Sequence, residues 1–216
     1  HQLAQAVDIV RGLRQDGIIR GVPSFLNLIT MGATFPEAME LSARRDAAWS
    51  EERLDALADD TGIGRWGFRL ALYGDPEVVD IHIRRVREAW AAIEGSRVDH
   101  ANTYTPETWH TIEPFIDRVL AGVPSFDLVD RMPEGQGHIG FSPVVPLVGD
   151  EVEKVVAIIK RHVIERVGTN FVCAIYPTND RSAIIVSSLT FDTRDEEQTR
   201  ASFETAKDLI AELGAL

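Results

Sequence analysis

The chain of 216 residues carries 34 acidic and 22 basic residues, a net charge of -12, and 44% of its residues are hydrophobic. This composition belongs to a folded globular protein with a sizeable core, and it excludes disordered, collagen-like and coiled-coil classes. An acidic surface repels phosphates and anionic lipid, so neither nucleic acid nor a membrane is expected as a partner. The single cysteine, Cys173, cannot form an internal disulfide, which favours a reducing compartment and a cytoplasmic location.

Apolar periodicity and turn residues outline the first half of the chain. Apolar residues recur at helical spacing from Leu3 to Leu13, and Gly17 ends that segment. Asp75-Pro76 opens another helix, since proline in the first turn loses no helical hydrogen bond. In chain order the patterns predict a helix at 3–13, a strand at 18–30, a short acidic helix at 51–60, a strand at 66–73, a helix from 75, a strand at 96–103 and a helix at 106–120.

The second half repeats the alternation of strands and helices. A helix begins at Gly149-Asp150 and is expected to end at Gly168, and two neighbouring apolar strands follow it as antiparallel partners. The predicted elements are a strand at 140–145, a helix at 149–167, strands at 171–176 and 183–190, and a helix at 195–213. The expected apolar face of the last helix comprises Phe203, Ala206, Ile210 and Leu213.

A faint internal repeat links the two halves. Gly67-Phe68 and Gly74-Asp75 recur as Gly140-Phe141 and Gly149-Asp150, each time as strand, Gly-Asp turn and helix. A Gly-Asp turn before a helix is also a common capping arrangement, so chance remains an alternative. The pattern predicts an α+β fold in which two ferredoxin-like halves form one broad antiparallel sheet with flanking helices.

One glycine-rich segment stands out, because dinucleotide-binding, P-loop, zinc-protease and hydrolase signatures are all absent from the sequence. In residues 134–146, three glycines surround His138 at a junction between loop and strand. Glycine permits close approach of a flat ligand, and a histidine held there could serve as a nucleophile, a proton shuttle or a ligand. A simple turn would carry the same residues.

The same segment resembles a known family. Gly137-His138-Ile139-Gly140-Phe141-Ser142-Pro143 is similar to the segment of vanillyl-alcohol and eugenol oxidases whose histidine is bonded to the flavin. The Val-Pro-Ser pieces at 22–24 and 123–125, and Trp66 to Gly74 ending in Ala-Leu-Tyr-Gly, match the family in the same order. The chain therefore resembles the vanillyl-alcohol oxidase and 4-cresol dehydrogenase flavoproteins over nearly its whole length.

This resemblance implies a role for the whole chain. Residues 1–216 would be the cap, or substrate-binding, domain of an FAD-linked oxidase, with the FAD-binding domain before it and a short segment after it. The complete enzyme would oxidise para-substituted phenols by hydride transfer to FAD, and the chain alone would be inactive. The family also implies a homodimer.

The resemblance further implies site residues. FAD is expected to be bound, covalently, at His138, with Gly137 and Ile139 beside it. The expected substrate-binding residues are Gly140, Ala174, Tyr176 and Ile185, and no catalytic residue is expected within this chain.

Other interpretations rest on the residues alone. The repeat, without a complete active site, also fits a stand-alone ferredoxin-like module for binding or oligomerisation. A metal enzyme has little support, because His100 and His110 lack a second ligand pair at suitable spacing. Arg69, on its predicted strand, would either point into the substrate cavity or form a salt bridge.

Overall fold

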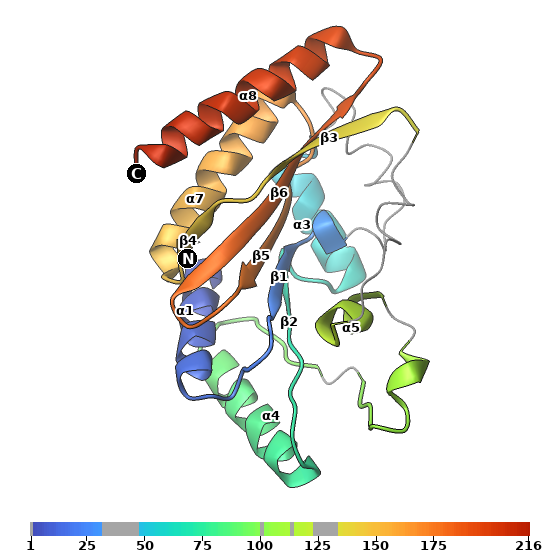
Figure 1. Ribbon diagram of the computed structural model, residues 1–216, viewed down its shortest axis with the longest axis vertical. Coiled ribbons are helices and arrows are strands. Elements are labelled where there is room, and N and C mark those ends of the chain that lie inside the picture. The colour runs from blue at the N-terminus through green and yellow to red at the C-terminus, as the bar shows by residue number, and fades with distance from the viewer. Residues whose placement is uncertain (1, 32–47, 100–101, 113–114, 123–133) are drawn as a thin grey trace.

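One antiparallel sheet organises the chain. The computed structural model describes residues 2–31, 48–99, 102–112, 115–122 and 134–216 (Figure 1). The six-stranded sheet has the order β2-β1-β5-β6-β3, and β4 also pairs with β6. The strands are β1 (Ser24–Asn27), β2 (Trp66–Arg69), β3 (Gln136–Phe141), β4 (Val144–Pro146), β5 (Val172–Pro177) and β6 (Ser182–Asp192). The predicted α+β class, with a single antiparallel sheet and flanking helices, is confirmed.

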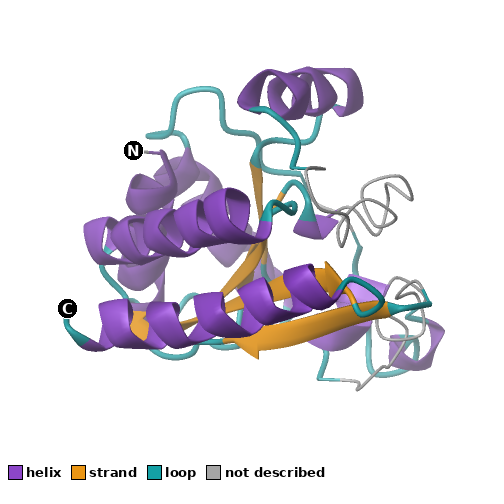
Figure 2. Ribbon diagram, turned by 90° about the horizontal axis from the view of Figure 1, so that it is seen from above, coloured by secondary structure: helices purple, strands orange, loops and turns teal. Residues whose placement is uncertain are grey.

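Helices pack side by side against this sheet. α7 lies between α1 and α8, and α4 packs against α1. Seen from above, the helix that ends at the C-terminus runs alongside the strands (Figure 2). The helices are α1 (Gln2–Gln15), α3 (Glu51–Thr61), α4 (Pro76–Trp90), α5 (Phe115–Leu120), α7 (Gly149–His162) and α8 (Glu196–Gly214), with short turns η2 (Trp109–Thr111) and η3 (Val163–Val167).

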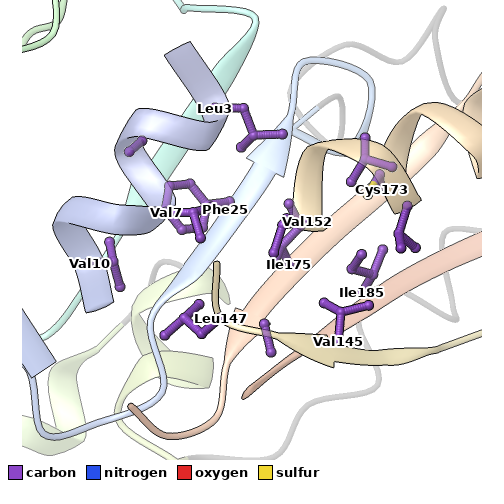
Figure 3. Packing of buried hydrophobic residues seen from close by; sticks show 14 of the residues in the cluster. Leu3, Val7, Val10, Phe25, Val145, Leu147, Val152, Cys173, Ile175 and Ile185 are labelled. Atoms are coloured by element: carbon purple, nitrogen blue, oxygen red, sulfur yellow. The ribbon is translucent and has the colours of Figure 1, made fainter. Parts of the chain in front are cut away.

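Side-chain alternation gives the sheet two unlike faces. Phe25 pairs with Ile175, and Ile175 pairs with Ile185, so these three side chains share one face. They are buried in the main core with Val7 of α1 and Val152 of α7 (Figure 3). We call this side the helix face. The outer face is the opposite side, whose residues alternate with these along each strand.

The contact between α1 and α7 depends on a glycine. A Cβ at Gly149 would lie 2.2 Å from the carbonyl oxygen of Ala4, so only glycine permits this approach. The backbone N–H of Gly149 donates to Oδ1 of Asp8 at 3.0 Å, which satisfies one free donor at the start of α7. The predicted helix start is therefore confirmed, with Val148 as the N-cap residue.

The strand predicted at 96–103 is wrong. The described residues of this range form no strand. Val98 is apolar, but both of its neighbours, Arg97 and Asp99, are charged. These two exposed side chains pair with each other at 2.7 Å. Such a segment has no apolar face to bury. The first half of the internal repeat consequently lacks the strand that follows its helix, whereas the second half has it.

Other elements are shorter than predicted. The strand at 18–30 is reduced to β1, and that at 66–73 to β2. The helix predicted at 106–120 is replaced by the single turn η2 and the short α5. In the sequence, Pro114 lies between these two elements, and proline is unfavourable inside a helix because it removes a backbone donor and clashes with the preceding turn.

The apolar face predicted for α8 is correct only in part. Ala206 is buried and Leu213 packs against the core, whereas Phe203 and Ile210 are 54% and 63% exposed. The buried residues of α8 are Gln198, Ser202, Thr205, Ala206 and Leu209. Two of these polar residues are bonded locally, which allows them to face the core: the hydroxyl of Ser202 donates to Gln198 O, and Oε1 of Gln198 accepts from Asp192 N.

Candidate functional site on the outer face of the sheet

His138 lies in the middle of β3, at one edge of the sheet. It pairs with Thr190 of β6, and Gly140 pairs with Ser188. Since paired residues point to the same side, all four belong to the outer face. The imidazole is exposed and has no hydrogen bond or ion pair within the described parts of the chain. Both ring nitrogens are therefore accessible to a ligand.

The two glycines that flank His138 have different roles. A Cβ at Gly137 would lie 2.6 Å from the ring of Phe191 and 2.9 Å from the Thr193 side chain, so packing on the helix face requires glycine there. A Cβ at Gly140 would meet no atom within 4 Å. Gly140 thus leaves free space on the same face as His138, and a flat ligand can approach the backbone at this point.

The ends of β3 and β6 hold His138 in place. Thr193 N and the Thr193 hydroxyl both donate to Gly135 O at 2.8 Å, and Gly135 has a φ of 82°, which glycine adopts without strain. Arg194 donates to both carboxylate oxygens of Asp192, at 2.8 and 2.7 Å. The Arg194 side chain lowers the pKa of Asp192 to about 2, so this carboxylate stays ionised at neutral pH.

Ala174 and Tyr176 of β5 lie on the outer face, as predicted for residues near a substrate. Ala174 pairs with Val186, and Tyr176 pairs with Ile184, which pairs with Val144 of β4. Ala174 is only 5% exposed, whereas Val186 and Val144 are exposed. Burial raises the pKa of the Tyr176 phenol, which therefore remains a neutral hydrogen-bond donor.

Two predicted site residues, Ile139 and Ile185, have side chains on the opposite side of the sheet from His138. Ile185 is fully buried and belongs to the core under α1 and α7. Ile139 pairs with Leu189 and packs against the same core. The structure does not bring either side chain to the face that carries His138, because neighbours on a strand point to opposite sides. Their side chains cannot contact a ligand bound there.

The sequence analysis missed the outer-face residues of β6. Val186, Ser188 and Thr190 follow Ile184 at every second position, and the last two pair directly with Gly140 and His138. The sequence signal for this set is weak, because residues 183–186 form a continuous apolar run, and the alternation becomes visible only in the burial of β6. Thr190 and Ser188 are the polar neighbours of His138 and Gly140, and Val186, Ile184 and Val144 continue the same face as apolar residues toward the other end of β6.

Arg69 is far from this surface. It lies on β2, at the opposite edge of the sheet from β3, and pairs with Ser24. Its guanidinium has no ion pair among the residues that the structure describes, so the predicted salt bridge is absent there. Arg69 is therefore not part of the surface around His138.

The remaining histidines do not form a metal site. Within the described ranges no group of three or more histidine, cysteine, aspartate or glutamate side chains is placed to bind a metal ion. His162 instead lies 2.7 Å from Glu212 of α8, and His100 lies outside the described residues. None of the helices within the described residues has the length and hydropathy needed to cross a membrane.

The fold and the sequence of the chain are similar to those of known phenol-oxidising enzymes. The fold matches p-cresol methylhydroxylase, with a TM-score of 0.75 and 23% identity, and the 4-ethylphenol oxidase of Gulosibacter chungangensis, with 0.73 and 21%. Each match covers 97% of this chain and 40% of the other. No family model matches the sequence.

The sequence match is more specific. The chain is homologous to the flavoprotein subunit of 4-cresol dehydrogenase (hydroxylating) from Pseudomonas putida, with 27% identity over 220 residues. The match includes 97% of this chain and 40% of that subunit. The predicted resemblance is thereby confirmed. The chain spans less than half the length of its relatives, so the activity of a complete protein is a matter for proposal.

Proposed function

We propose that this chain is the substrate-covering part of an FAD-dependent enzyme that oxidises para-substituted phenols. The observation that carries this proposal is the position of His138, which is exposed on the outer face, has no partner in the described part of the chain, and lies near the free space over Gly140. Homology to a flavoprotein subunit supplies the identity of the flat ligand. When bound, FAD would accept a hydride from the carbon attached to the phenol ring.

The residues of this chain fit a flavin beside the strand. A neutral imidazole is a nucleophile, and among the described residues His138 has no competing partner, which supports the covalent bond expected from the resemblance. Gly140 allows a ring system to lie against the backbone. Gly137 would act indirectly, because it lets β3 approach Phe191 and so fixes the position of His138.

The neighbouring residues suit a phenol. Val186 and Val144 offer apolar contacts that exclude water, with Ala174 buried behind them. Tyr176 keeps its proton and can donate a hydrogen bond to a substrate oxygen. No side chain of this chain needs to act as an acid or base in the reaction. We further propose, from the resemblance, that the complete protein is a cytoplasmic homodimer.

Covalent flavin attachment tests the proposal directly. The complete protein that contains this chain is denatured in acid, and flavin fluorescence that remains with the polypeptide is measured. We expect wild type to retain flavin and His138→Ala to release it, because the nucleophile is lost. His110→Ala, which removes another exposed histidine, is the matched control and should retain flavin.

The other outcomes are equally informative. If wild type binds flavin but all three proteins release it equally in acid, the proposal of a flavoenzyme stands. The proposed covalent role of His138 is then refuted. Absence of flavin from the complete wild-type protein would refute the proposal and favour a stand-alone module for binding or oligomerisation.

A further inference from the structure

One hydroxyl group on the outer face lies opposite the free space over Gly140. Ser188 of β6 pairs with Gly140 of β3 on one side and with Val172 of β5 on the other, so these residues form one row across the sheet. Since paired residues point to the same side, the Ser188 side chain shares the face that carries His138. A Cβ at Gly140 would meet no atom within 4 Å, so the position beside Ser188 on this face is open.

The hydroxyl of Ser188 is accessible and unused. Ser188 is half-buried, and its Oγ forms no hydrogen bond with any residue that the structure describes. Unlike Oγ of Ser24, which is unpartnered and closed off from solvent, Oγ of Ser188 can be reached from outside. The adjacent Ser187 is different again, because it is 2% exposed on the helix face and its hydroxyl donates to Val172 O at 2.7 Å. Of these two neighbours, only Ser188 offers a donor and an acceptor to a ligand.

The surroundings of Ser188 on this face favour recognition of a single oxygen atom. The next residue of β6 on the same face is Val186, which is exposed, and the partner on β5 is Val172. In the other direction along β6, Thr190 is buried and already has an interaction partner. A ligand without a suitable oxygen would displace water from Ser188 and leave its hydroxyl unpaired, so such a hydroxyl discriminates between ligands.

The free space over Gly140 also lies close to His138. The two residues are two positions apart on β3, so about 7 Å separates their Cα atoms. A phenol oxidised by a flavin attached at His138 has to lie beside that flavin, and the space over Gly140 is open there.

From these observations we propose that Ser188 is a specificity-determining residue, whose hydroxyl forms a hydrogen bond with an oxygen on the carbon attached to the phenol ring. The enzyme then prefers para-hydroxybenzyl alcohols to para-alkylphenols. This inference rests on the proposed function and adds the class of phenol to it.

Two substrates of nearly the same shape test this preference. 4-Hydroxybenzyl alcohol carries a hydroxyl where 4-ethylphenol carries a methyl group, and both have hydrogen on the carbon attached to the ring. Each phenol is mixed with the complete protein in the absence of oxygen and other electron acceptors, and the loss of flavin absorbance gives a rate and an apparent Kd. We expect wild type to show the higher ratio of rate to Kd with the alcohol. Ser188→Ala should lower the advantage of the alcohol about three- to tenfold, because only the alcohol loses a hydrogen bond.

Two further variants serve as controls. Ser188→Thr retains the hydroxyl and should retain the preference, whereas Ser187→Ala removes the adjacent hydroxyl on the helix face and should leave the preference unchanged. An unchanged preference in Ser188→Ala, or flavin reduction that slows equally with both phenols, would overturn the inference while the proposed function stands. Flavin that neither phenol reduces in wild type would refute the proposed function, and the inference with it.

Discussion

Neighbouring residues of β6 have opposite roles at the residue scale. Ile185 fills the core between the sheet and α7, whereas Val186 is exposed on the face that carries His138. A single position along the strand thus separates a residue that stabilises the fold from one that is free to contact a ligand. The family resemblance selected Ile185 for the substrate site because sequence similarity does not specify which way a side chain points.

Truncation of these two residues should separate stability from substrate preference. Ile185→Ala is expected to lower the free energy of unfolding by about 2–5 kcal/mol, since it leaves a cavity in a packed core. Val186→Ala should change the free energy of unfolding by about 0.5 kcal/mol or less. The same substitution should alter the KM for a para-alkylphenol. Urea unfolding and steady-state kinetics of the complete protein measure both quantities. A KM that responds only to Ile185→Ala would contradict the assignment of faces.

At the scale of elements, helix packing depends on small residues at specific contacts. Gly149 allows α7 to approach the backbone of α1, and α8 docks through Ser202, Thr205 and Ala206. Glu212 of α8 also bonds Arg161 and His162 at the end of α7, at 2.6 and 2.7 Å. Helix periodicity predicted that these helices exist and that Ala206 and Leu213 face the core, but it also assigned Phe203 and Ile210 to that face, and both are exposed.

Two glycines in this helix pair provide a matched comparison. Gly149→Ala should destabilise the protein by about 3 kcal/mol or more, because the new Cβ would overlap the Ala4 carbonyl and α7 would have to shift. Gly12→Ala lies within α1 and meets no atom within 4 Å. That substitution should stabilise by about 0.5–1 kcal/mol through helix propensity. Thermal unfolding of both variants measures these changes in stability. Equal changes in the two variants would argue against the close α1–α7 contact.

At the scale of the whole molecule, the outer face is an incomplete site. It supplies His138, the space over Gly140 and an apolar wall that includes Val186, but these form one surface only. The chain spans 40% of the length of the subunit to which it is homologous. We expect the rest of a complete protein to cover this surface, because a flavin and a phenol need enclosure from water on both sides.

Comparison of the 216-residue chain with the complete protein tests this arrangement. The chain alone should retain no flavin after gel filtration and should oxidise no phenol, since one wall supplies too few contacts. The complete protein should be yellow, and its mass in sedimentation equilibrium should be that of a dimer. Phenol oxidation by the isolated chain, or a monomeric complete protein, would refute the corresponding part of the proposal.

The sequence by itself determined the α+β class, the main helices, the antiparallel partners β5 and β6, and the segment around His138. These features are local: they depend on periodicity, on turn residues and on a short motif that adjacent positions define. It also indicated the relationship to 4-cresol dehydrogenase, because the matching motifs keep the same order along the chain.

Tertiary structure decided which residues face one another. The side of the sheet occupied by Ile139 and Ile185, the absence of a strand among the described residues of 96–103, and the buried side of α8 all depend on partners distant in sequence. Such contacts form only when strands pair and helices dock, and packing then overrides the local preference of each residue. His138 could be identified from the sequence, but the surface around it exists only in the folded sheet.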